Sequence, residues 1–261
     1  MHVMRRAVEE AGRVQLAGLG RGREVQHKGP YDLVTDIDRR CDELITSILT
    51  SADSSYGLLT EESRPQETGA ENVWIIDPLD GTTNYTHGYP AFCTSLALRH
   101  GGEIVAGAVY DPLRDELFEA RRGGGALLNE EPIRVSGTRE LSQSLLATGF
   151  PYDRLEQPET NLDRFCTMTL RTRGVRRGGS AALDLCYTAC GRLDGFWEIR
   201  LFPWDVCAGA IIVEEAGGRI TDLAGGAYDY TGAETVASNA LLHQVLVDSL
   251  ADSHPAAPCF G

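Results

Sequence analysis

The chain lacks the features that define several protein classes. No apolar run approaches the ~18 residues that a membrane-spanning helix needs, so we expect no membrane segment. Acidic side chains outnumber basic ones 38 to 24, and the resulting net charge of −14 disfavours binding to nucleic acids. The amino-terminal segment carries charges where a signal peptide needs an apolar core. We therefore expect a cytoplasmic protein.

The sequence also lacks the cysteine motifs that bind metals or carry out redox reactions. The seven cysteines form no CxxC pair, which argues against a zinc site or a thioredoxin-like centre. Cys186 and Cys190 lie four residues apart on an expected helix, a spacing typical of core packing. The odd number and the apolar surroundings predict reduced, structural thiols.

The hydrophobic pattern predicts a layered α/β fold. The 261 residues are enough for one large domain or two closely packed lobes. In the first half we expect helices at 3–19 and 37–52, and strands at 56–60, 73–76, 93–99, 103–110, 116–121 and 125–128. In the second half we expect strands at 145–148, 174–177, 193–199, 218–222 and 235–238, and helices at 157–172, 180–190, 205–216 and 239–251.

The two halves differ in their arrangement. Glycine-containing turns join the strands of the first half, so its sheet should be largely antiparallel. Strands and helices alternate in the second half. We expect subdomains at 1–141 and 142–252 with the functional site between them, and a flexible tail at 253–261.

The most informative segment is WIIDPLDGTTNY, which begins at Trp74. The apolar run Val73–Ile76 predicts a buried strand that stops at Asp77. Asp77 and Asp80 are three residues apart and can converge on one point beyond the strand end. Oxygen ligands at this spacing suit a hard divalent cation such as Mg²⁺.

The residues that follow have two interpretations. Gly81 permits a tight turn, and Thr82 or Thr83 can cap a following helix whose free N–H groups face a phosphate. Aspartate followed by glycine is also ordinary turn chemistry, so the segment alone does not decide.

Each of the other candidate carboxylates, taken alone, can be explained by a structural role without any function. Glu61 and Glu62 follow a strand-like run and have the character of a solvated surface. Asp38 lies at the start of a helix, where the helix dipole favours an acid. Asp205 lies at the first turn of an apolar helix, where an N-cap would explain it.

Taken together, these segments resemble the inositol monophosphatase family of lithium-sensitive, Mg²⁺-dependent phosphatases. The matching pieces occur in the family's order over nearly the whole chain: DLVTDID, EES after Thr60, WIIDPLDGTTNY, RGGSAALDLCYTACGRLDGFWE and PWDVCAGAIIVEEAGG. The resemblance implies an αβαβα sandwich like that of fructose-1,6-bisphosphatase, and a homodimer.

The resemblance also implies a metal site with two to three Mg²⁺ ions per subunit. Glu61, Asp77 and the carbonyl of Leu79 would hold the first ion. Asp77 would bridge to a second ion, which Asp80 and Asp205 also hold. A third, weaker ion would share Glu61.

Catalytic and phosphate-binding roles follow from the same resemblance. Thr82, hydrogen-bonded to Asp38, would help to orient the attacking water, and Glu61 completes the catalytic set. The backbone N–H groups of Gly81 and Thr82 would hold phosphate oxygens beside Asp80. The chemistry is attack on a phosphate monoester by water that the metal activates.

Five further positions have implied roles or depart from the family's pattern. Ala181 and Glu198 would face the inositol hydroxyls, and Glu62 would support its neighbouring ligand. Lys28, the only lysine among the 24 basic side chains, matches a lysine on a mobile loop near the metals. Thr60 stands where the family has glycine, and a β-branched residue does not take a positive φ comfortably.

We therefore expect hydrolysis of a phosphate monoester, with myo-inositol monophosphate as the favoured substrate. Glu198 favours a polyol, because a carboxylate accepts hydrogen bonds from adjacent hydroxyls. Histidinol phosphate, fructose 1,6-bisphosphate and adenosine 3′,5′-bisphosphate remain alternatives. A second phosphate could use the basic cluster Arg171, Arg173, Arg176 and Arg177, although a solvated face is the simpler interpretation. A non-catalytic dimeric scaffold is disfavoured, because it would have lost at least one of the ligands.

Overall fold

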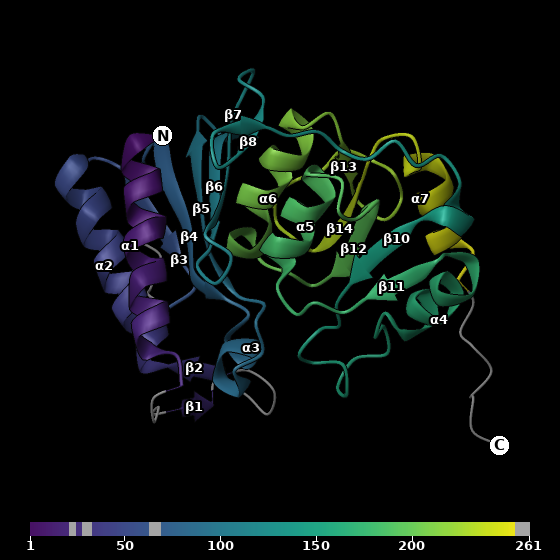
Figure 1. Cartoon of the computed structure of the whole chain (residues 1–261), viewed down its shortest axis with the longest axis horizontal. Helices are drawn as coiled ribbons and strands as arrows, with labels where there is room; N and C mark the ends of the chain where they lie inside the picture. The colour runs from purple at the N-terminus through teal and green to yellow at the C-terminus, as the bar shows by residue number, and fades with distance from the viewer. Residues whose placement is uncertain (21–24, 28–32, 63–68, 254–261) are drawn as a thin grey trace.

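The computed structural model describes residues 1–20, 25–27, 33–62 and 69–253. Its helices and sheets stack in alternating layers, with helices α1 and α2 on one outer face and α4 and α7 on the other (Figure 1). Two sheets lie between these faces, and α5 and α6 separate them. The predicted αβαβα sandwich is confirmed.

The first outer layer consists of α1 (His2–Gly18) and α2 (Asp36–Ala52). Both helices are amphipathic and bury one face on the first sheet, α1 over β5 and β6 and α2 over β4. Thr35 caps α2, because its side-chain oxygen accepts a hydrogen bond from the Ile37 N–H. This cap fixes the first turn of α2 near the end of β4.

The first sheet has the strand order β3-β4-β5-β6-β7-β8-β9. Its strands are β3 (Gly57–Thr60), β4 (Asn72–Asp80), β5 (Cys93–His100), β6 (Glu103–Asp111), β7 (Glu116–Arg121), β8 (Ala126–Leu128) and β9 (Glu131–Pro132). Only the β3–β4 pair is parallel among these, so the predicted antiparallel character is confirmed. The two-residue β9 escaped prediction, because it is too short to show alternation and contains proline.

The central layer contains α5 (Ala181–Ala189) and α6 (Pro203–Glu215). Helix α6 packs on strands of the first sheet, while α5 packs on α6 and on strands of the second sheet. Every residue from Val206 to Val213 is buried, which explains why the sequence of α6 is apolar all round. At Gly107 the sheet approaches so closely that a Cβ atom there would lie 2.8 Å from the Ala208 carbonyl oxygen.

The second sheet has the order β11-β10-β12-β14-β13. Its strands are β10 (Leu145–Thr148), β11 (Gly174–Arg176), β12 (Gly195–Ile199), β13 (Arg219–Thr221) and β14 (Glu234–Ser238). Strand β10 runs parallel to β11 and β12, whereas β14 is antiparallel to both of its neighbours. Helices α4 (Leu162–Arg171) and α7 (His243–Ala251) cover its outer face around the buried Trp197.

Four short elements complete the described chain. Strands β1 (Val25–His27) and β2 (Leu33–Thr35) form a small antiparallel pair that we did not predict. Helix α3 (Thr82–His87) follows β4 directly, and a helical turn, η1 (Leu141–Gln143), lies between the two sheets in sequence.

Several predicted boundaries were wrong. Strand β4 does not end at Ile76 but continues to Asp80, with a register shift against β5 between Asp77 and Asp80. Helix α4 starts at Leu162 rather than at 157, because Asn161 has a left-handed backbone with φ of 67°.

The starts of two later elements were also placed too early. Strand β12 begins at Gly195, and α7 begins at His243 rather than at 239. In the turn before α7, the Asn239 side chain accepts a hydrogen bond from the Leu242 N–H. This bond holds the chain in a turn ahead of the helix.

The boundary near residue 141 falls between the two sheets, and one buried cluster spans both sides of it. Division into two subdomains therefore stays a prediction. The predicted tail lies almost wholly outside the described residues. Across the described part of the chain, no helix is both long and apolar enough to cross a membrane.

Candidate active site

Strand β4 carries two predicted ligands, Asp77 and Asp80, at its carboxyl end. Asp77 and Asp80 are 1% and 8% exposed, and the register shift between them lets both face one cavity of about 240 Å³. The Leu79 N–H donates to Oδ1 of Asp77 at 2.9 Å, which fixes that side chain. The cavity is lined by Glu61, Asp77, Leu79, Asp80, Gly81, Thr82, Tyr152, Phe202, Trp204 and Asp205.

Asp80 is held by the second half of the chain. Both the Ser180 hydroxyl, at 2.6 Å, and the Ala182 N–H, at 2.8 Å, donate to its Oδ2 atom. These donors lie at the N-terminus of α5, where Ser180 also caps the helix. The two halves of the fold therefore meet at a carboxylate.

Asp205 enters the cavity from the first turn of α6, as the sequence predicted. Its Oδ2 atom accepts a hydrogen bond of 2.7 Å from the Phe202 N–H. The N-cap position belongs to Phe202, so the N-cap interpretation of Asp205 was wrong. Because this bond holds one carboxylate oxygen, the side chain is oriented into the site.

Glu61 is positioned by the parallel ladder between β3 and β4. Its N–H donates to the Ile76 carbonyl at 3.2 Å, which brings Glu61 beside Asp77. Thr60 is buried and ends β3 in ordinary strand geometry, so no positive φ is needed there. The concern about a β-branched residue at this position was wrong. Glu62 is partly exposed, and its supporting role stays a prediction.

Burial raises the pKa of three carboxyl groups in this cavity. The pKa of Asp77 is raised well above its ordinary value, first by burial and then by repulsion from Glu61, Asp80 and Asp205. Burial likewise raises the pKa of Asp80 and of Asp205. Packing several acids together is costly without a positive charge.

The donor chemistry of the cavity fits divalent cations. All of its predicted ligands are hard oxygen atoms from carboxylates and one carbonyl, which is the donor type that Mg²⁺ prefers. Within the described ranges, no three acidic, histidine or cysteine side chains already enclose a point as a ligand group. The assignment of individual ligands therefore remains a proposal.

Thr82 and Asp38 lie in contact at the edge of the cavity. The Thr82 hydroxyl lies 2.9 Å from Oδ1 of Asp38 and 3.0 Å from the carbonyl oxygen of Leu79. The backbone N–H of Thr35 donates to the other oxygen of Asp38. Burial raises the pKa of Asp38, although hydrogen bonds from Thr35 and Thr82 oppose this shift.

Gly81 forms the turn between β4 and α3. Its φ of 91° is left-handed, and a Cβ atom there would lie 2.8 Å from the Ala91 carbonyl oxygen, so glycine is required. Neither Thr82 nor Thr83 caps the helix as predicted, because Gly81 itself occupies the N-cap position. The left-handed turn brings the chain into α3 without a side-chain cap.

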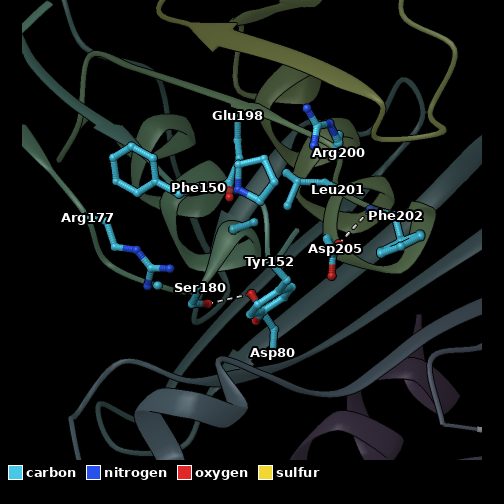
Figure 2. A pocket seen from close by; sticks show the side chains of 14 residues that line it. Asp80, Phe150, Tyr152, Arg177, Ser180, Glu198, Arg200, Leu201, Phe202 and Asp205 are labelled. Carbon is cyan, nitrogen blue, oxygen red and sulfur yellow. Dashed lines mark hydrogen bonds between the residues drawn. The ribbon is translucent and has the colours of Figure 1, made fainter. Parts of the chain in front are cut away.

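A smaller cavity of about 60 Å³ adjoins the first, and Asp80 and Asp205 line both. Figure 2 shows the side chains that line the smaller cavity. Glu198 reaches it from β12 and Ala181 from α5. Burial raises the pKa of Glu198 to about 8, although the positive charge of Arg177 acts in the opposite direction. The two positions that the sequence assigned to the substrate alcohol thus share one cavity.

The sequence missed three residues of this region. A Cβ atom on Gly149 would lie 2.1 Å from Oε1 of Glu198, so only glycine leaves room for that carboxylate. Tyr152 lines both cavities. Asp184 is a buried carboxyl whose pKa is raised well above its ordinary value by burial and by Glu198. Only Asp184 had a visible signal, as an acid on an otherwise apolar helix.

The basic cluster divides in the structure. Arg171, Arg173 and Arg176 are exposed and line neither cavity, in keeping with a solvated face. Arg177 instead lines the smaller cavity (Figure 2). Lys28 lies outside the described residues.

Comparison with known proteins agrees with this geometry. A sequence model described as the inositol monophosphatase family matches residues 2–254. The chain is 43% identical to an inositol-1-monophosphatase of Synechocystis sp., with coverage of 96% of this chain and 88% of the relative. It is 40% identical to the Nus factor SuhB of Pseudomonas aeruginosa, with coverage of 87% and 85%.

Solved structures give the same result. The structure of inositol monophosphatase from Anabaena (Nostoc) sp. superposes with a TM-score of 0.91 at 42% identity, and the match covers 98% of this chain and 96% of that one. The match therefore covers both sheets of the fold. The chain belongs to the inositol monophosphatase family.

Proposed function

We propose that this protein hydrolyses myo-inositol monophosphate to inositol and phosphate with the help of Mg²⁺. The observation that carries the proposal is the cavity of about 240 Å³ in which Glu61, Asp77, Asp80 and Asp205 gather beside Thr82. Membership of the phosphatase family and relatives that bear the name inositol-1-monophosphatase support the reaction and the substrate.

Two to three cations would be held by the oxygen atoms of this cavity. Glu61, Asp77 and the Leu79 carbonyl would hold one, and Asp77, Asp80 and Asp205 another. Bound cations supply positive charge that offsets the charge of the phosphate and lowers the pKa of water. The raised pKa values of Asp77, Asp80 and Asp205 support this assignment, because buried acids that repel one another are favourable sites for a cation.

The Thr82–Asp38 pair would handle a proton during attack by water. When the Thr82 hydroxyl donates to Oδ1 of Asp38, its oxygen is left to accept a hydrogen bond from water. Asp38 is buried with a raised pKa, which makes it a better proton acceptor than an exposed aspartate. The N–H groups of Gly81 and Thr82 would hold the phosphate oxygens.

The smaller cavity would receive the alcohol. Glu198 and Ala181 line it, and the Glu198 carboxyl can bond to hydroxyl groups of a polyol. Arg177 lines the same cavity and is the one member of its cluster placed to meet a second phosphate. A bisphosphate is therefore the second candidate substrate.

The proposal is tested by phosphate release from four esters, each with and without Mg²⁺. These are inositol 1-phosphate, histidinol phosphate, fructose 1,6-bisphosphate and adenosine 3′,5′-bisphosphate. Metal-dependent turnover that is fastest on inositol 1-phosphate supports the proposal. Faster turnover of another ester would replace the substrate, and no turnover despite Mg²⁺ binding would favour a non-catalytic scaffold.

We further propose a cytoplasmic homodimer that Li⁺ inhibits. The free cysteines of the described residues support a reducing compartment. Light scattering during size-exclusion chromatography measures the assembly, and a particle of 28.4 kDa would contradict the dimer. Similarity to Nus factor SuhB proteins lends weak support to an additional binding role.

A further inference from the structure

Asn84 joins the two sides of the site through its side-chain amide. On α3, it donates from Nδ2 to the Ala91 carbonyl at 2.7 Å and to the Gly178 carbonyl at 2.9 Å. Ala91 precedes β5 in the first sheet, whereas Gly178 precedes α5. The side chain is 9% exposed, and both amide hydrogens are used.

The Gly81 turn and the segment before α5 lie so close because each contributes a glycine. A Cβ atom on Gly81 would lie 3.3 Å from the Gly179 carbonyl oxygen, and one on Gly179 would lie 2.9 Å from Nδ2 of Asn84. Both glycines have left-handed backbones, with φ of 91° and 84°. The contact therefore leaves no room for a side chain at Gly81 or Gly179.

This contact lies between groups that serve opposite ends of the substrate. Gly81 belongs to the proposed phosphate side, and its turn leads into Thr82. Gly178 and Gly179 lead into Ala181, which lines the smaller cavity with Glu198. Asn84 follows the Gly81 turn on α3, so its bond to the Gly178 carbonyl ties the phosphate side to the alcohol side.

We propose that Asn84 is a positioning residue that sets substrate discrimination by holding the alcohol-binding segment against the phosphate-binding turn. The inference rests on the proposed function. It assigns Asn84 no contact with the reacting atoms. Its loss affects a substrate whose alcohol fills the smaller cavity more than one whose alcohol makes no hydroxyl contacts.

The test compares Asn84→Ala with wild type on inositol 1-phosphate and on 4-nitrophenyl phosphate. Loss of two hydrogen bonds predicts a fall of about thirtyfold in kcat/KM for inositol 1-phosphate. We expect a fall of less than about fivefold for 4-nitrophenyl phosphate, because its hydrolysis needs only the phosphate side. Equal losses on both esters would overturn the proposal.

Asn239→Ala is the matched control. Asn239 is 2% exposed and also joins distant segments, with donations to Ser136 Oγ at 2.9 Å and to the Thr138 carbonyl at 2.8 Å. It follows β14 at the end where Ser238 pairs with Gly195, and lines neither cavity. We expect a loss of stability with an unchanged ratio of the two activities.

Hydrogen exchange without substrate provides a readout that does not depend on activity. In Asn84→Ala, amides of residues 176–183 should exchange faster, while those of β5 and β6 keep their rates. Unchanged exchange at 176–183 would overturn the inference even if the enzyme proves active. If wild type hydrolyses neither ester, the proposed function fails and exchange still tests Asn84. Asn84→Ser supplies the same comparison if the alanine variant does not fold.

Discussion

The buried carboxyl of Glu198 makes a quantitative prediction about stability. Its pKa is raised from 4.5 to about 8, and burial is the main cause. The folded protein therefore keeps a proton that the unfolded chain releases, so the associated stability is complete below pH 4.5 and is lost as pH rises toward 8. At pH 7, about 2.5 pH units above the unfolded pKa, the loss is about 3 kcal/mol.

Glu198→Gln removes this titration and keeps the size of the side chain. We expect the variant to be more stable than wild type by about 3 kcal/mol at pH 7, and to differ by less than about 0.5 kcal/mol near pH 4.5. Urea unfolding in the presence of EDTA, at both pH values, measures the difference. The variant should also lose preference for inositol 1-phosphate over 4-nitrophenyl phosphate while its Mg²⁺ affinity stays unchanged.

Glu119→Gln is the matched control for this experiment. Glu119 is also buried, at 3% exposed, but Arg5 pairs with it at 2.6 Å. Removing that carboxylate breaks an ion pair, so the control should lose stability at pH 7. A gain in Glu198→Gln that is the same at both pH values, or no gain at pH 7, would refute the account of Glu198.

Three other results are expected. Asp77→Asn should lower Mg²⁺-dependent turnover at least about 100-fold, and turnover within a few-fold of wild type would contradict its role as a ligand. In EDTA the same variant should have a raised melting temperature, because one of several acids that repel one another becomes neutral. Thr82→Val should lower kcat about 100-fold, because it removes the hydroxyl that donates to Asp38, and should leave Mg²⁺ binding unchanged. Steady-state kinetics measures kcat, and calorimetry measures Mg²⁺ binding. Burial lowers the pKa of His243 from 6.5 to about 4. As pH falls from 6.5 to 4, wild type should therefore lose about 3 kcal/mol of unfolding free energy relative to His243→Asn. The same pH dependence of urea unfolding in both proteins would exclude this account.

The sequence located most elements because their signals are local. Helices α1 and α2 follow from one-sided apolar periodicity, and β5 to β7 follow from apolar strands separated by glycine turns. The predicted boundaries were wrong where turn signals and strand signals occur in the same segment. The chain through Asp77-Pro78-Leu79-Asp80 reads as a turn, yet pairing with β5 on the far side of the register shift keeps it in the sheet.

For the candidate site, the sequence named the acids and the family resemblance grouped them. No local rule could show that Ser180 and Ala182 would both donate to Asp80, because Asp80 lies 100 or more residues earlier in the chain. Gly149 and Asn84 were missed for the same reason. A glycine before an exposed loop and an asparagine after two threonines have no signal until their neighbours are known.

The sequence by itself determined the layered α/β class, because this depends on hydrophobic periodicity, and the family, because this depends on residue types at fixed spacing along the chain. Only the tertiary structure decided which acids share the larger cavity, that burial raises the pKa of Asp77, and that α3 meets the segment before α5 at Asn84. Desolvation and close packing depend on atoms brought together from distant parts of the chain, and residue order does not specify those contacts locally.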